Sequence, residues 1–149
     1  MSTELIDEIQ AIETSAIEQI ATVDSVERLS DGHAATGAGP VLVLVDVADP
    51  GNAGTLLRSA EAAGATEVWS VAGSVDLFAP KVVRASAGAL FHVPVLADID
   101  ADTAIGELRA AGIAVLGTRA RDGVPYDRAD LAGPSALMLG NEAHGLDEK

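Results

Sequence analysis

The sequence predicts an α/β fold in which helices flank a parallel β-sheet. The first reason is the run VLVLVDV at residues 41–47, because a continuous apolar, β-branched stretch is typical of a strand buried on both faces. The second is that strand-like and helix-like segments alternate after it, as parallel strands with right-handed crossovers require. The third is that 48% of the residues are hydrophobic but only 3% are aromatic, so the core must be built from aliphatic side chains.

The segments before this pattern are predicted to form a helix and a linker. Apolar residues recur at helical spacing over residues 5–23 with acidic residues between them, which predicts an amphipathic helix that packs on the domain or on a partner. Residues 30–40, SDGHAATGAGP, are small, polar and rich in glycine, as in a linker. We therefore expect an N-terminal part at residues 1–39 and one folded domain at residues 40–149.

The regular part contains five predicted strands and three predicted helices. After the strand at residues 41–47, a helix is expected over residues 54–63 with Gly64 as its C-cap. The next helix has Pro80 in its first turn and ends at Gly88. The other elements are strands at residues 66–72, within 89–98, at 113–118 and at 135–140, and a helix at 103–112. Functional groups in such a sheet gather at the carboxyl ends of the strands.

The charge balance limits the possible partners. Nine basic residues against 23 acidic ones give a net charge of −14. Binding to nucleic acid depends on local positive potential, so a broad nucleic-acid footprint is disfavoured, whereas a small basic patch inside an acidic surface is still compatible. All basic residues except Lys81 and Lys149 are arginines, which suit bidentate phosphate contacts. Adaptation to high salt is an alternative reason for the acidity.

Several classes of protein are disfavoured by what the sequence lacks. It has no run of about 18 apolar residues for a membrane span, and its acidic N-terminus does not resemble a secretion signal. It has no cysteine for disulfide or thiolate chemistry. His33, His92 and His144 show no metal-ligand spacing, so no metal site is expected. We expect a soluble, cytoplasmic protein.

The stretch DPGNAGTLLRSAEAAG at residues 49–64 joins the first strand to the first helix. It lacks the G-x-G-x-x-G spacing of dinucleotide folds and the G-K-[ST] ending of a P-loop, so a nicotinamide or ATP site is poorly supported. The tripeptide DPG predicts a tight turn, after which Asn52 can cap the helix. Arg58 is then either a solvated helix arginine or a cation directed into the crevice at the strand ends.

The stretch LMLGNEAHGL at residues 137–146 is predicted to be a strand followed by a polar turn. Taken alone, its Glu142 could be an acid favoured at a helix N-terminus. The spacing L-G-N-E-x-x-G-L within it resembles the second motif of SpoU-type (TrmH-type) RNA ribose 2′-O-methyltransferases. The spacing N-x-G-x-x-x-R at Asn52, Gly54 and Arg58 resembles their first motif. VVRASAGALFHVPV at residues 82–95 resembles the segment that precedes their third strand.

This resemblance covers residues 41–149 and implies a fold and an activity. The implied fold is the SPOUT, or α/β knot, fold, which binds S-adenosylmethionine in a C-terminal trefoil knot. The implied activity is methyl transfer to a ribose 2′-hydroxyl of ribosomal or transfer RNA, not of DNA. Members of the family are homodimers in which RNA crosses the dimer interface.

The resemblance also implies roles for single residues. Arg58 would activate the 2′-hydroxyl, as a general base or through the adjacent phosphate; because arginine stays protonated, stabilising the developing alkoxide is the role that chemistry favours. Asn52 would fix Arg58 and the RNA by hydrogen bonds, and Glu142 would hold the second-motif loop near the active site. Arg84 is a further candidate for an RNA phosphate contact, with a surface salt bridge as the alternative.

The implied cofactor site uses the loops after the fourth and fifth strands. Thr118 lies just past Gly117 in the first of these loops. In the second, Gly140 would let the backbone approach the cofactor closely, because a Cβ there would intrude. The implied cofactor-binding residues are Gly117, Thr118, Leu139, Gly140 and Asn141.

One part of the family pattern has no counterpart in this sequence. The third motif, P-M-x-G followed by S-L-N, leads into a helix that threads the knot and covers the methionine end of the cofactor. Since the sequence stops at Lys149, we expect the knot-forming segment to be missing and cofactor binding to be weak or absent. Residues 23–40 are similar to the tail of a substrate-recognition domain and its linker.

Two other functions are compatible with the sequence. The chain could be a non-catalytic remnant that dimerises through an apolar surface at Leu137, Met138 and Leu139, which the missing last helix would leave uncovered. A flavodoxin-like nucleotide or flavin binder is supported by fold class alone, and the sequence offers it no phosphate-cradling loop.

Overall fold

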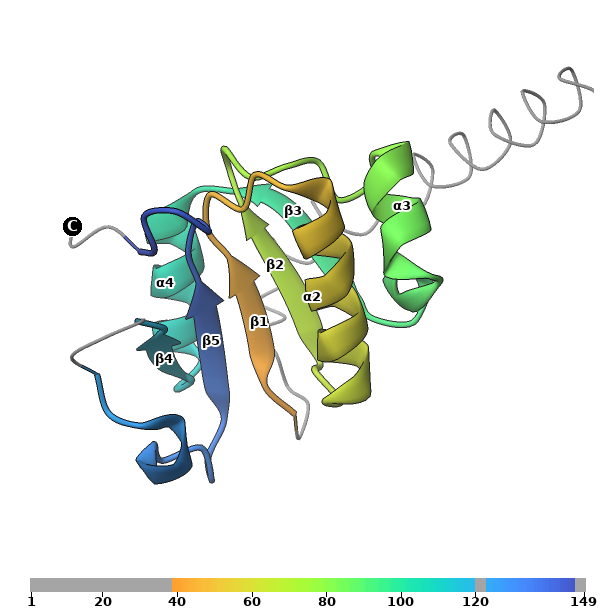
Figure 1. Cartoon of the computed structure of the whole chain (residues 1–149). Coiled ribbons are helices and arrows are strands. Elements are labelled where there is room, and N and C mark those ends of the chain that lie inside the picture. Colours follow the sequence, from red (N-terminus) through yellow and green to blue (C-terminus); the bar gives the residue numbers. More distant parts are fainter. Residues whose placement is uncertain (1–38, 120–122, 147–149) are drawn as a thin grey trace, which may run out of the picture. The chain divides into compact units, whose positions relative to one another are not determined.

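The computed structural model describes residues 39–119 and 123–146, which contain a five-stranded sheet, three α-helices and two short 3₁₀ helices (Figure 1). The predicted α/β fold with a parallel sheet is confirmed. The strands are β1 (Val41–Leu44), β2 (Glu67–Val71), β3 (Val95–Ile99), β4 (Ala114–Gly117) and β5 (Ser135–Leu139). The helices are α2 (Pro50–Ala62), α3 (Pro80–Ser86), α4 (Ala101–Ala110), η1 (Ala89–Phe91) and η2 (Tyr126–Arg128).

The strands lie in the order β3-β2-β1-β5-β4, and every neighbouring pair is parallel. The chain builds the sheet outward from β1 to β3 and then crosses to the other side of β1. The strand order therefore reverses between β1 and β5, which is the place where open α/β sheets bind their ligands. The loops that follow β1, β4 and β5 all lie at this carboxyl edge.

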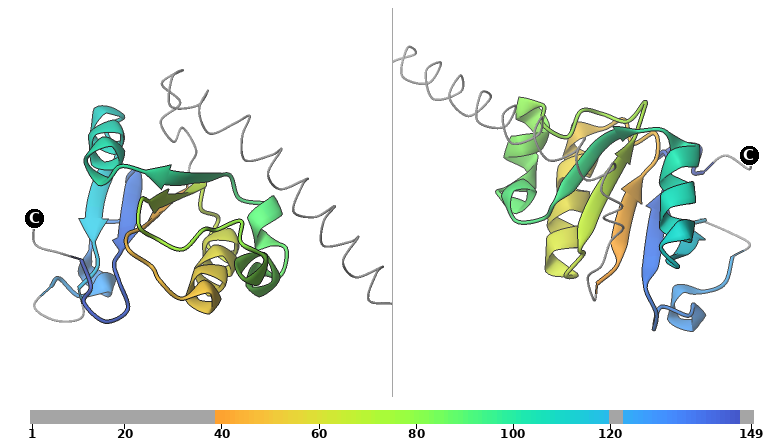
Figure 2. Two further views of the ribbon diagram at one scale, coloured as in Figure 1. Left: turned by 90° about the horizontal axis from the view of Figure 1, so that it is seen from above. Right: turned by 180° about the vertical axis from the view of Figure 1, so that it is seen from behind.

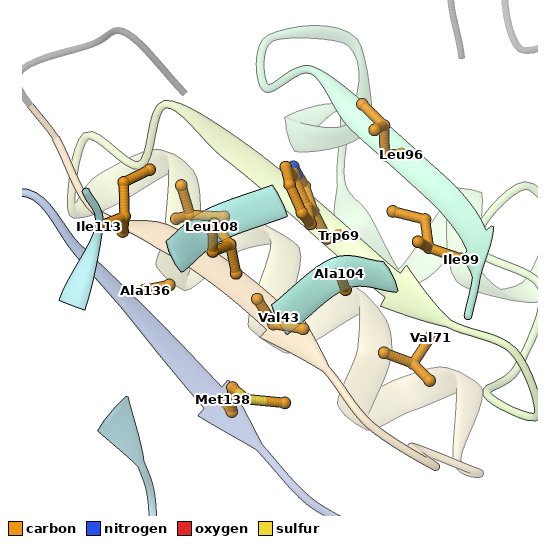
Figure 3. Packing of buried hydrophobic residues seen from close by; sticks show 11 residues of the cluster. Val43, Trp69, Val71, Leu96, Ile99, Ala104, Leu108, Ile113, Ala136 and Met138 are labelled. Carbon is orange, nitrogen blue, oxygen red and sulfur yellow. The ribbon is translucent and has the colours of Figure 1, made fainter. Parts of the chain in front are cut away.

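Helices cover both faces of the sheet, with α2 and α3 on one face and α4 on the other (Figure 2). On the α4 face, Trp69 of β2 is 1% exposed and belongs to the same cluster as Ala104 and Leu108 of α4 (Figure 3). On the opposite face, fully buried Leu57 of α2 and Val82 of α3 pack in the second cluster. Each fully buried large aliphatic side chain contributes about 1.5–3 kcal/mol, so both layers are anchored mainly by aliphatic packing.

The first helix begins earlier than the sequence predicts. The Asp49 carboxylate is the N-cap and accepts a hydrogen bond of 2.8 Å from the backbone N–H of Asn52, with Pro50 as the first helical residue. The prediction that Asn52 caps a helix starting near Gly54 was therefore wrong, because a carboxylate followed by proline already satisfies the first turn. At the other end Ala63 is the C-cap, and Gly64 follows it with φ +68°.

Other boundaries shift for similar local reasons. The run at residues 41–47 leaves the sheet after Leu44, and Asp46 takes a left-handed φ of 53°. Asp100 caps α4, so this helix starts at Ala101. The helix predicted up to Gly88 ends at Ser86, because Ala87 has a φ of 50°.

The apolar surface expected at the fifth strand is smaller than predicted. Met138 is buried and Leu137 and Leu139 are half-buried, because β5 lies inside the sheet between β1 and β4. The large hydrophobic side chains that are exposed within residues 39–119 and 123–146 are Phe91, Val124, Tyr126 and Leu131. The non-catalytic alternative, which was based on that surface, stays a prediction.

The predicted helix within residues 5–23 and the predicted linker lie almost entirely outside the described residues, and the boundary between residues 39 and 40 stays a prediction. Within the described ranges, no helix has both the length and the apolar composition needed to cross a membrane.

Candidate functional site

The two sequence motifs meet at the carboxyl edge of the two central strands. Leu44 of β1 pairs with Leu139 of β5, so the loop after each strand starts at the same height of the sheet. Figure 1 shows both loops at the same end of the molecule, beside the N-terminus of α2. The fold thus brings together segments about 90 residues apart, as a switch point in strand order allows.

A side-chain hydrogen bond joins the motifs. Asn52 donates through Nδ2 to Oε1 of Glu142 at 3.0 Å. The backbone N–H groups of Ala48 and Asp49 also point at the Glu142 carboxylate, at longer distances of 3.5 and 3.4 Å. Glu142 is therefore held against the turn that opens α2.

These contacts stabilise the charged form of Glu142. The hydrogen bond from Asn52 is the largest cause that holds the pKa of Glu142 below its ordinary value, followed by backbone N–H groups. The position beside the N-terminus of α2 also favours an anion. Since Glu142 stays ionised and exposed at neutral pH, it acts as a hydrogen-bond acceptor and a fixed negative charge.

Asn141 forms a second link between the same loops. Its Nδ2 donates to the backbone carbonyl of Asp46 at 2.9 Å and to the Asp46 carboxylate at 3.2 Å. Its Oδ1 accepts from the backbone N–H groups of Ala143 at 2.8 Å and His144 at 3.2 Å. Both ends of the amide are thus used in shaping the loop.

Gly140 is required by the loop itself. The loop closes on itself by backbone hydrogen bonds between Asn141 and Gly145 of 2.8 and 3.0 Å. A Cβ on Gly140 would lie 2.2 Å from the Gly145 carbonyl carbon and 2.5 Å from the Leu146 nitrogen. A side chain at this position would therefore push the loop open whether or not a ligand is bound.

Arg58 lies on a different part of α2 and contacts α3. Its guanidinium donates to the backbone carbonyl of Ala85 and to Oγ1 of Thr55, the latter at 3.1 Å. Asn52 is thus paired with Glu142 and not with Arg58, although the resemblance implied that Asn52 would fix the arginine. Two N–H groups of the exposed Arg58 side chain are used in these bonds, and three of the five donors of a guanidinium are left.

Gly54, the middle residue of the first motif, lets α2 and α3 approach each other. A Cβ on Gly54 would stand 2.4 Å from the Cβ of Ala85 and 2.8 Å from the Ser86 nitrogen. Because the same Ala85 carbonyl accepts from Arg58, the close approach and the arginine contact depend on each other. The three motif residues therefore have three separate structural tasks.

The other predicted site residues occupy the same edge or its surroundings. Thr118, exposed after β4, donates from Oγ1 and from its backbone N–H to the Met138 carbonyl, both at 3.0 Å. A Cβ on the exposed Gly117 would meet only the Leu146 side chain, at 3.0 Å. Arg84 is exposed in the last turn of α3, and no hydrogen bond or ion pair of its side chain occurs within the described residues.

Sequence reasoning missed three participants. Asp49 was assigned to a turn, although the Asp-Pro pair in front of a helix is a known cap signal. Asp46 carries no sequence signal, because its left-handed backbone and its bonds to Asn141 arise only when β1 and β5 are neighbours. The Ala85 carbonyl is a backbone group and has no sequence signature. Within the described residues, no group of three or more metal-ligating side chains is present.

Comparison with known proteins shows which family this chain resembles. Residues 39–149 match the SpoU rRNA Methylase family. The 23S rRNA (guanosine(2553)-2′-O)-methyltransferase RlmP of Bacillus subtilis is 38% identical over 135 residues, which is 91% of this chain and 52% of that protein. The chain therefore spans about half the length of this curated relative.

Solved structures show the same fold. An AdoMet-bound rRNA methyltransferase from Sinorhizobium meliloti superposes with a TM-score of 0.73 at 35% identity, covering 80% of this chain and 45% of that one. The SpoU methyltransferase AviRb from Streptomyces viridochromogenes gives a TM-score of 0.72 at 29% identity, covering 83% and 49%. The architecture implied by the resemblance is thereby confirmed, while the knot stays a prediction. The chain belongs to the SpoU rRNA Methylase family.

Proposed function

We propose that this domain catalyses methyl transfer from S-adenosylmethionine to a ribose 2′-hydroxyl of ribosomal or transfer RNA. The observation that carries the proposal is the hydrogen bond from Asn52 to Glu142, which joins the two family motifs into one site at the switch point of the sheet. The names of the relatives support the reaction class, since they include rRNA 2′-O-methyltransferases.

The chemistry needs a group that stabilises a developing alkoxide. A ribose hydroxyl ionises far above neutral pH, and its oxygen becomes more negative as its proton passes to solvent water. In this proposal Arg58 supplies the positive charge, because arginine stays protonated and has donors left beyond those used on Ala85 and Thr55. Glu142 is a poor base, since its pKa is lowered by Asn52, so its role is to orient Asn52 and the second-motif loop.

The residues at the carboxyl edge fit one side of the cofactor. Gly117 and Gly140 carry no side chain over their peptide groups, and Thr118 turns its hydroxyl away onto Met138. In this proposal, the backbone groups of the two loops that are not used in the bonds of Thr118, Asn141 and Gly145 hold a flat, polar ring and an amino acid moiety. The proposed cofactor-binding residues are Gly117, Thr118, Leu139, Gly140 and Asn141. The bound cofactor supplies an electrophilic methyl group.

The proposal includes partners and a location. Arg58 and Arg84, which are exposed on α2 and α3, are the proposed phosphate contacts of this acidic chain. We infer a homodimer, which would add a second copy of the site and more RNA-contacting surface. The proposed location is the cytoplasm.

Cofactor binding is tested by calorimetric titration of the 149-residue chain with S-adenosylmethionine, beside a version extended by the third motif of a family member. Binding by the extended version with micromolar affinity is expected. If the short chain binds equally well, the expectation that the third motif completes the pocket is wrong. If neither version binds, the proposed function fails.

The position of methylation is tested with unmodified ribosomal and transfer RNA transcripts and the version that binds cofactor. The product should be a 2′-O-methylated nucleotide, recognised because the adjacent phosphodiester resists alkaline hydrolysis. Arg58→Ala should lower the rate about 10²-fold or more, as for the loss of one oxyanion-stabilising group, and leave cofactor affinity unchanged. Arg109→Ala removes the same charge from exposed α4 and should have no effect. A methyl group on a base would contradict the proposal.

A further inference from the structure

A hollow at the carboxyl edge of the sheet contains no residue of either motif. It has a volume of about 360 Å³, within the range of small-molecule sites. It lies where β2 and β3 end, under the segment that leads into α3. Its lining combines apolar walls with four polar side chains: Ser70, Val71, Ser74, Val75, Asp76, Leu77, Ala97 and Asp98.

A β-bulge shapes this hollow. Trp69 pairs with Leu96 and Val71 pairs with Ile99, so Ser70 alone faces the two residues Ala97 and Asp98. Asp98 at the bulge has a φ of 59°, a conformation that costs a non-glycine residue roughly 1 kcal/mol or more. Bulges of this kind redirect side chains and are frequent beside functional sites. Here the bulge brings an aspartate to the wall of the hollow.

Ser70 points to a ligand independently of the acids. It is only 3% exposed, yet its hydroxyl has no hydrogen-bond partner within the described part of the chain. Within the described residues, every fully buried side-chain oxygen or nitrogen has a hydrogen-bond partner. The Oγ of Ser70 has none, so it is not fully buried. Its exposed part faces the hollow, which Ser70 lines. Because this Oγ is open to the hollow and has no protein partner, a ligand there can accept a hydrogen bond from it.

The hollow is attached to the loop that carries the proposed active site. Ser74 donates from Oγ to the Leu44 carbonyl at 3.3 Å, and the backbone N–H of Val75 donates to the Val47 carbonyl at 2.8 Å. These bonds connect its wall to the segment between β1 and α2, which ends in Asp49. The hollow therefore lies on the same edge of the sheet as the Asn52–Glu142 pair.

We propose that the hollow binds a guanine base of the RNA substrate. Asp98 has no hydrogen-bond partner within the described residues, whereas Asp76 already accepts from the Phe78 N–H. A carboxylate accepts two parallel hydrogen bonds, and guanine is the RNA base with two adjacent donors, N1–H and N2–H, on its pairing edge. Its neighbouring O6 accepts the proton of the Ser70 hydroxyl, and the apolar walls contact the ring. The choice of RNA as ligand class rests on the proposed function.

The test is binding of free guanosine to the ¹⁵N-labelled 149-residue chain, followed by amide chemical shifts. Guanosine should shift the signals of Ser70, Ser74 and Asp98 with a dissociation constant in the millimolar range. Inosine has the same ring and O6 but lacks the 2-amino group, so it should bind about tenfold more weakly. This assay needs neither cofactor nor catalysis, so its failure is distinguishable from failure of the proposed function.

Variants locate the contacts. Asp98→Asn retains a residue type that tolerates positive φ and removes the carboxylate, and Ser70→Ala removes the hydroxyl. Each should weaken guanosine binding by about tenfold. Asp102→Asn removes an exposed acid of α4 and should change nothing. Equal binding of guanosine and inosine, no shift at these amides, or shifts with Mg²⁺ alone would overturn the proposal.

Discussion

At the scale of single residues, the two motifs divide their work between polar contacts and close packing. Asn52 and Glu142 form a hydrogen bond between loops, whereas Gly54 and Gly140 leave room for neighbouring backbone. The resemblance indicated these residues as site candidates, but the sequence could not predict their partners. Arg58 contacts a backbone carbonyl 27 residues away, and a carbonyl leaves no trace in a sequence pattern.

Replacing Asn52 by alanine should raise the pKa of Glu142 towards its ordinary value of 4.5, because the largest cause of its lowering is removed. A lowered folded pKa means that the contribution of Glu142 to stability is complete above the ordinary pKa and is lost as the pH falls through the folded one. In the variant this pH-dependent contribution becomes smaller. Carboxyl-carbon NMR titration of Glu142 measures the effect.

The matched control for this titration is Thr103→Ala. Thr103 lowers the pKa of Asp100 through backbone and side-chain hydrogen bonds, so this variant changes Asp100 and leaves Glu142 unaffected. An unchanged Glu142 pKa in Asn52→Ala would mean that the bond between the motifs does not form in solution.

At the scale of helices and strands, the sequence predicted type and order and missed several boundaries. The first strand was found because a buried parallel strand is continuously apolar, and the others were found from the alternation of strand-like and helix-like segments. The start of α2 was missed because Asp49 and Asn52 are both good caps, and only the position of the turn decides between them. The bulge in β3 could not be predicted, because it depends on the register between β2 and β3.

Gly54→Ala should destabilise the domain through the packing of α2 on α3. The new Cβ would lie 2.4 to 2.8 Å from Ala85 and Ser86, and two of those three contacts are with backbone atoms. Overpacking of this kind costs about 1–3 kcal/mol, which opposes and exceeds a helix-propensity gain of at most about 1 kcal/mol. Urea unfolding followed by fluorescence of Trp69, the one tryptophan of the chain, measures the difference.

The control substitution is Gly106→Ala in the middle of α4. A Cβ at Gly106 meets nothing within 4 Å, so the change should stabilise the domain by up to about 1 kcal/mol. If Gly54→Ala were as stable as Gly106→Ala, the two helices could not be as close as the structure has them.

At the scale of the whole molecule, the charge of −14 has consequences for both stability and substrate binding. A phosphate backbone approaches such a chain only where positive charge is concentrated, and Arg58 and Arg84 on the α2–α3 side offer two candidates. The charge balance is compatible with a small basic patch, and the place of such a patch depends on how α3 packs on α2. The carboxyl edge of the sheet, by contrast, is rich in acidic residues. Their carboxylates suit the hydrogen-bond donors of a nucleobase better than they suit a phosphate.

The same excess of acids should make folding salt-dependent. Like charges repel most strongly in the compact state, and raising NaCl from about 0.01 M to 0.15 M shortens the Debye length from about 30 to 8 Å. We expect the folded state to gain about 1 kcal/mol, which corresponds to a rise in Tm of about 2–4 °C for a chain of this size. Thermal unfolding followed by Trp69 fluorescence measures this rise in Tm.

Screening should saturate at a few tenths molar, whereas preferential exclusion of sulfate continues to stabilise at higher concentration, so a parallel series in Na₂SO₄ separates the two effects. A Tm that falls as NaCl is added would mean that favourable ion pairs outweigh the repulsion between the acids.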